Sequence, residues 1–148
     1  MTVNTQINST VEYLKSTVTL SSANIKGMYA APVILIPAQG AHTIIMIHDV
    51  LLELVFSTLA YTGSDGNGSV IMQYGNTVHG AGPSALIINS IVTGAVNSVG
   101  TSANVNISDS PTNYINAAIY ASNTTSAYAT GSGTINCTIF YSIINTIT

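Results

Sequence analysis

Charged side chains are scarce in this sequence of 148 residues. Aspartate, glutamate, lysine and arginine together make up 5% of the chain, whereas about 25% is usual in soluble proteins. Arginine and tryptophan are absent, and the two lysines are Lys15 and Lys26. Two lysines cannot neutralise a run of phosphates, and they cannot form a polybasic patch for an anionic membrane. We therefore expect neither a nucleic acid nor a membrane as a partner.

Cysteine occurs once, at Cys137, which excludes a disulfide within the chain and a metal site built from several thiolates. The histidines, His42, His48 and His79, follow no metal-ligand spacing. His48 and Asp49 are adjacent, so in a strand their side chains point to opposite faces. The sequence therefore predicts no metal site and no cofactor.

A catalytic constellation is also missing. Cys137 lies in an alternating apolar run without a neighbouring base, and no Gly-x-Ser-x-Gly turn precedes a helical stretch. Asp49 and Glu53 would lie on one face of a strand, at a rise of about 13 Å, which is too far for the carboxylate pair of a glycosidase. We expect a protein that is not an enzyme.

Alternation of apolar and polar residues dominates the chain, and this period is typical of strands. Hydrophobic residues make up 47% of the sequence, so we expect it to fold as one domain. Ser21 to Met28 is expected to form one short helical turn. The pattern predicts about eight strands in an all-β sandwich, barrel or jelly roll, over 10–20, 31–37, 43–57, 69–74, 84–93, 103–109, 113–121 and 134–145. Residues 1–9 are predicted to be a flexible arm that precedes the domain of residues 10–148.

The run from His42 to Ser57 carries apolar side chains on both faces of the expected strand. One face would meet the domain core, and the other would meet a neighbouring subunit or a covering loop. The low charge of the chain favours a surface that other subunits cover, although an extracellular surface coated with Ser, Thr and Asn is the alternative. The candidate oligomer interface consists of Ile45, Ile47, Asp49, Leu51, Glu53 and Val55.

Three stretches resemble a group of small tailed-bacteriophage virion proteins. Residues 18–41, VTLSSANIKGMYAAPVILIPAQGA, are similar to the opening of those proteins. Residues 60–63 with 73–75, and the closing run 134–141, are similar to their middle and end. The resemblance spans residues 18 to 142 and rests on Pro, Gly and apolar positions. It implies a single-domain antiparallel β-sandwich of jelly-roll type and the role of a capsid decoration or cement protein, which is often trimeric.

The function that we expect is that of a non-enzymatic virion protein that is made in the host cytoplasm and stabilises the assembled capsid. Its partners would be the major capsid protein and copies of itself, with a trimer favoured and residues 1–9 facing the capsid. The alternative is a receptor- or glycan-binding tip of a tail fibre or spike, because the loops 61–68 and 122–130 are rich in Tyr and Asn. The candidate partner-binding residues in the first loop are Tyr61, Asp65 and Asn67.

Overall fold

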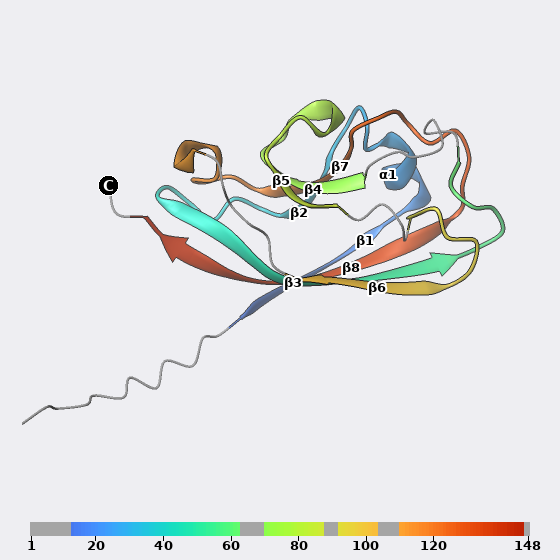
Figure 1. Cartoon of the computed structure of the whole chain (residues 1–148), viewed down its shortest axis with the longest axis horizontal. Coiled ribbons are helices and arrows are strands. Elements are labelled where there is room, and N and C mark those ends of the chain that lie inside the picture. Colours follow the sequence, from blue (N-terminus) through green and yellow to red (C-terminus); the bar gives the residue numbers. More distant parts are fainter. Residues whose placement is uncertain (1–12, 63–69, 88–91, 104–109, 147–148) are drawn as a thin grey trace, which may run out of the picture.

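The computed structural model describes residues 13–62, 70–87, 92–103 and 110–146 (Figure 1). The described elements include one α-helix, α1 (Ser22–Gly27), and two short 3-10 helices, η1 (Val78–Gly80) and η2 (Pro111–Asn113). The strands are β1 (Leu14–Leu20), β2 (Val33–Ile36), β3 (Thr43–Phe56), β4 (Val70–Tyr74), β5 (Ser84–Ile87), β6 (Ser98–Ala103), β7 (Ile119–Asn123) and β8 (Gly133–Asn145).

The strands form two four-stranded antiparallel sheets with the orders β1-β8-β3-β6 and β2-β7-β4-β5. The pairing follows a simple rule, in which the first strand pairs with the last, the second with the seventh, the third with the sixth and the fourth with the fifth. The chain is thus a long two-stranded ribbon with the β4–β5 hairpin at its tip, folded over to make two layers. This is the strand order of a jelly roll, and it confirms the expected all-β sandwich.

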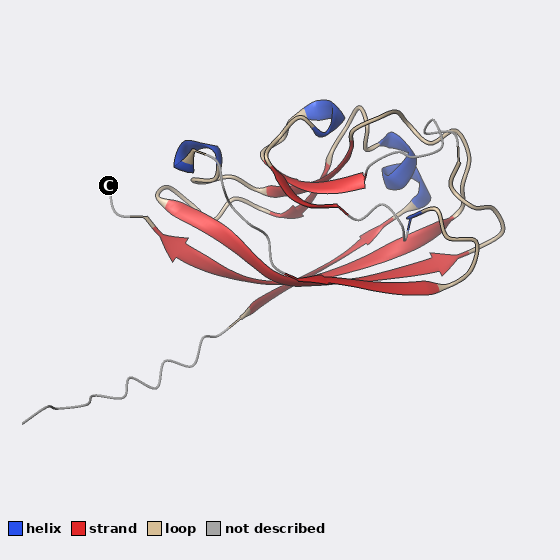
Figure 2. Cartoon of the chain, in the orientation of Figure 1, coloured by secondary structure: helices blue, strands red, loops and turns tan. Residues whose placement is uncertain are grey.

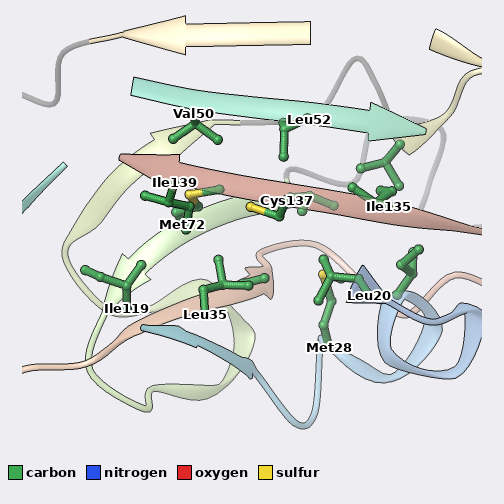
Figure 3. Packing of buried hydrophobic residues seen from close by; sticks show 14 of the residues in the cluster. Leu20, Met28, Leu35, Val50, Leu52, Met72, Ile119, Ile135, Cys137 and Ile139 are labelled. Carbon is green, nitrogen blue, oxygen red and sulfur yellow. The ribbon is translucent and has the colours of Figure 1, made fainter. Parts of the chain in front are cut away.

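The core lies between the inner faces of the two sheets. Figure 3 shows Leu35 and Ile119 of one sheet facing Val50, Cys137 and Ile139 of the other. Alternation along β8 places Ile135, Cys137 and Ile139 inward, as the sequence predicts. The largest side chains that are almost fully buried are Leu20, Ile25, Met28, Ile36, Ile45, Leu54, Tyr61, Met72, Tyr74, Ile119, Ile135 and Ile139.

The predicted helical turn is confirmed as α1. Ser21 is its N-cap, and the Ser21 hydroxyl accepts a hydrogen bond from the backbone N–H of Asn24 at 3.2 Å. The Asn24 side chain accepts in return from the Ser21 N–H at 3.0 Å, which completes a capping box. Ile25 is buried from this helix and Met28 from the residue that follows it, so α1 closes one end of the sandwich.

Several strand boundaries differ from the prediction, and those of β6 and β7 differ most. β6 occupies Ser98–Ala103, ahead of the strand predicted over 103–109, and residues 104–109 lie outside the described part. β7 begins only at Ile119, because residues 113–118 finish η2 and turn at Asn116, whose φ is +52°. β6 consists of small residues, so its sequence lacks the alternation of apolar and polar residues that is typical of a strand. At Asn116 a positive φ interrupts the extended backbone expected over 113–121.

Candidate functional site

The two sheets differ in what covers their outer faces. Every residue of β4 is buried, including those that point away from the core. The loop that carries η1 lies over this sheet (Figure 2). It is fixed there because Gln73 Nε2 donates to the Gly75 carbonyl oxygen at 3.2 Å and the Gly80 N–H donates to Ser122 Oγ at 3.0 Å. The chain therefore covers the β4 part of this outer face by itself, whereas Ile34 of the edge strand β2 is 47% exposed.

The outer face of the β1-β8-β3-β6 sheet is open, and no other element of the described residues lies over it (Figure 1). We call this surface the bare face. Hydroxyls, amides and apolar groups dominate it, and of the charged residues that the structure describes only Lys26 lies elsewhere. The bare face consists of Lys15, Thr17, Thr19, His48, Asp49, Leu51, Glu53, Val55, Val99, Thr101, Asn136, Thr138, Phe140 and Ser142.

A β-bulge in β3 decides which of the predicted interface residues belong to the bare face. The register of β3 against β8 shifts between Ile47 and Asp49, which leaves His48 as an extra residue. Before the bulge Ile45 and Ile47 point into the core and are 1% and 4% exposed. The prediction that Ile45 and Ile47 share the outer face is therefore wrong, because a single extra residue inverts the alternation of the strand.

The other predicted interface residues, Asp49, Leu51, Glu53 and Val55, follow the bulge and lie on the bare face. Val55 is 46% exposed, and on the neighbouring β6 Val99 is 66% exposed. That these residues form an oligomer interface stays a prediction.

The bulge also positions two rings at one end of the bare face. His48 Nε2 and Ser142 Oγ lie 2.8 Å apart, and the centroids of the His48 and Tyr13 rings lie 4.5 Å apart. The extra residue thus presents a half-buried imidazole on the outer face, held between β8 and the start of β1.

Two hollows interrupt the bare face. The larger has a volume of about 410 Å³ and is lined by Tyr13, Asp49, Val50, Leu51, Thr101 and Phe140. The smaller has about 280 Å³ and is lined by Glu53, Leu54, Val55, Asn97, Ser98 and Val99. Each hollow combines apolar walls with one carboxylate, so each is suited to a side chain with an apolar stem and a positive end.

The predicted partner-binding loop is different. Tyr61 is 1% exposed, its hydroxyl donates to the Gly133 carbonyl oxygen at 2.9 Å, and its ring packs edge-on against Tyr128. The prediction of an exposed Tyr61 is therefore wrong, because the ring fills the core. Asp65 and Asn67 lie outside the described residues.

The Cys137 thiol and the Tyr128 side chain are buried. Burial raises the pKa of the Cys137 thiol to about 12 and that of the Tyr128 hydroxyl to about 12. Within the residues that the structure describes, no three His, Cys, Asp or Glu side chains lie together as metal ligands would. None of the helices in the described ranges is long and apolar enough to span a membrane.

Lys15 and Phe140 also belong to this site, although neither is among the residues predicted from the sequence. The alternation in 10–20 and 134–145 contains the signal for their outward direction, but not for their pairing across β1 and β8. Comparison with known proteins finds no matching family model, no matching curated protein and no matching solved structure.

Proposed function

We propose that this chain is a non-enzymatic structural protein of a virion, a decoration or cement protein that binds the assembled capsid as a homo-oligomer. The observation that carries the proposal is the contrast between the two sheets. The chain's own loop covers the β4 part of one outer face, whereas the bare face is left open along its length with few charges on it.

The composition of the bare face suits contact with protein. Leu51, Phe140, Val55 and Val99 are spread among threonine, serine and asparagine side chains. The cores of protein interfaces are depleted of charged residues in the same way. Covering such a surface removes apolar area from water, which contributes about 25 cal/mol per Å². Contact of the bare face with a second protein is therefore more favourable than leaving this face exposed to water.

The virion assignment draws on the resemblance to tailed-phage virion proteins and on the jelly-roll strand order, which recurs in viral capsid domains. The site of action is the capsid surface, with the major capsid protein and copies of this chain as partners. Several weak contacts made by one oligomer add up to lasting attachment by avidity. We assign the capsid contact to residues 1–9, which lie outside the residues that the structure describes, and the resemblance favours a trimer.

The receptor- or glycan-binding tip is less favoured. That role needs exposed aromatic side chains in the loops 61–68 and 122–130, whereas Tyr61 and Tyr128 are buried. Buried tyrosines are not available to stack on a sugar ring.

The test is to look for the chain on particles. Virions are purified by density from the source of the sequence and probed with an antibody raised against the recombinant chain. We expect the chain to band with the particles in a fixed ratio to the main shell protein, and to rebind after it has been stripped. Particles that lack the chain would refute the proposal.

Two variants make the rebinding assay specific. Leu51→Lys places a charge in the middle of the bare face and should weaken rebinding. Asn76→Lys adds the same charge to the exposed loop over the other sheet and should leave rebinding unchanged. Equal rebinding of the two variants would remove the bare face from the proposal.

A further inference from the structure

Two opposite charges flank one aromatic side chain on the bare face. Phe140 of β8 is the register partner of Lys15 on one side and of Asp49 on the other. Neighbouring strands lie about 4.8 Å apart, so the two charged residues stand on either side of Phe140 at similar distances. Lys15 and Asp49 are both exposed.

This arrangement is complementary to itself. A twofold axis that runs along β8 above Phe140 turns the face over and exchanges the β1 side with the β3 side. Lys15 of each subunit then lies opposite Asp49 of the other, and the two Phe140 rings meet at the axis. An isologous contact of this kind uses the same patch on both subunits.

The hollow beside Asp49 fits the lysine that this symmetry brings to it. Its walls include Leu51, Phe140 and Tyr13, against which the methylene groups of a lysine can pack. Asp49 lines the same hollow and can receive the ammonium group. A volume of about 410 Å³ leaves room for such a side chain.

The next outward row opposes Thr17 to Leu51, and the row after it also brings no like charges together. Asn136 is the register partner of Thr19 on one side and of Glu53 on the other. The rotation therefore places Thr19 of one subunit opposite Glu53 of the other, so that no like charges meet in this row. The Thr19 hydroxyl itself donates to Asn136 Oδ1 within its own subunit at 2.9 Å. An axis across the strands would instead oppose lysine to lysine and aspartate to aspartate, which is unfavourable.

We propose that the bare face binds a second copy of this chain across a twofold axis along β8, with Lys15 of each subunit paired to Asp49 of the other. The inference rests on the proposed function in one respect, since it names the partner of the same face. A twofold contact makes a dimer of single subunits, and it joins two trimers into a hexamer if the favoured trimer forms elsewhere. Breaking the contact halves the native mass in either case.

The experiment measures native mass by light scattering on a sizing column for Lys15→Glu, Asp49→Lys and their mixture. Each variant alone opposes like charges and should have half the native mass of the unmodified protein, with a dissociation constant raised at least about tenfold. A mixture of the two in equal amounts should regain the full mass, because each glutamate at position 15 then faces a lysine at position 49. The double variant Lys15→Glu/Asp49→Lys should also regain it.

Lys26→Glu is the matched control, because it changes the net charge as Lys15→Glu does but lies on α1, away from the bare face. Its mass should stay that of the unmodified protein. Circular dichroism of every variant checks that the fold is kept, as expected for exposed positions. An unchanged mass for Lys15→Glu, a mixture that fails to regain mass, or an unmodified protein that is a single subunit or a lone trimer would overturn the pairing.

These outcomes are separate from those of the particle assay. A chain that is absent from virions but pairs and re-pairs as described would refute the proposed function and keep this inference. If the chain is found on virions but its native mass is unchanged by Lys15→Glu, the proposed function is kept and this inference is refuted.

Discussion

The Tyr74 hydroxyl donates a hydrogen bond to the Ile45 carbonyl oxygen across the sandwich, at 2.7 Å. Both residues are 1% exposed. β6 pairs with Asp49 to Leu54 of β3, so Ile45 lies beyond the part of β3 that β6 covers. The hydrogen bond from Tyr74 is made to this part of the strand. The Tyr74 ring also packs edge-on against Tyr114, with the ring centroids 4.8 Å apart. One side chain of β4 thus fixes the spacing of the two sheets and satisfies a buried carbonyl.

Removing this hydroxyl should destabilise the fold. Tyr74→Phe leaves a buried carbonyl oxygen without its donor, so we expect the free energy of unfolding to fall by about 1–3 kcal/mol. Urea unfolding followed by tyrosine fluorescence measures the change. Tyr13→Phe is the control, because Tyr13 is 55% exposed and its hydroxyl can bind water in both variants. Equal losses in the two variants would show that the Tyr74 bond contributes nothing.

Stability should fall at alkaline pH. Burial raises the pKa of Tyr74 to about 12 from an ordinary value of 10, and that of Cys137 to about 12 from an ordinary value of 9. The unfolded chain therefore loses these protons at a lower pH than the folded chain does. The stabilisation is fully present below pH 9 and is lost as pH rises from about 9 to 12, by at most about 1.4 kcal/mol per pH unit for each group.

Urea midpoints at pH 8, 10 and 11 check this pH dependence. In Cys137→Ala the decline in the free energy of unfolding between pH 8 and pH 10 should be shallower, because the thiol no longer titrates. A stability that is constant up to pH 11 would speak against native pKa values raised by burial.

The fold should need a residue at position 48 to form the bulge, but it should not need the histidine side chain there. Deleting His48 forces either Ile45 and Ile47 or Val50, Leu52 and Leu54 to point outward. Each apolar side chain brought to the surface costs about 1.5–3 kcal/mol, so the deletion should abolish cooperative unfolding. His48→Ala keeps the register and should cost less than about 1.5 kcal/mol. Thermal melts of the two variants test this. Similar melting temperatures would argue against the idea that the extra residue fixes the register of β3.

Gly131 should not tolerate a side chain. Its φ is +130°, and a Cβ at this position would overlap the Tyr61 ring. Gly131→Ala should lower the free energy of unfolding by more than about 2 kcal/mol. Gly27→Ala is the matched control, because a Cβ there meets nothing within 4 Å. Chemical denaturation of the two variants gives the comparison, and a Gly131→Ala protein as stable as the control would contradict it.

Local patterns predict the strands whose side chains alternate in a regular way. β8 and α1 follow directly from the apolar period of 134–145 and from the cap at Ser21. The bulge has no such signal, because the register of β3 is set by its partner strand and not by the composition around His48. The position of β6 has no local signal for a related reason. Its residues are small, and backbone pairing with β3 holds this edge strand in place.

The candidate site is harder to predict than the strands. Its outward residues Asp49, Leu51 and Glu53 follow from alternation once the bulge is known. Lys15 and Phe140 meet only because the beginning and the end of the described chain pair in one sheet, and no local pattern contains that information.

The position of β8 between β1 and β3 also sets an order of events during synthesis. A ribosome makes β8 after every other described strand. β1 and β3 therefore cannot join this sheet until β8, the strand that pairs with both, has been made. Pairing of such distant segments is slow, and this sheet is completed only after residues 133–145 have been made. Phe140, and with it the alignment of Lys15 and Asp49, is in place only then. Incomplete chains therefore have no finished surface with which to join an assembly.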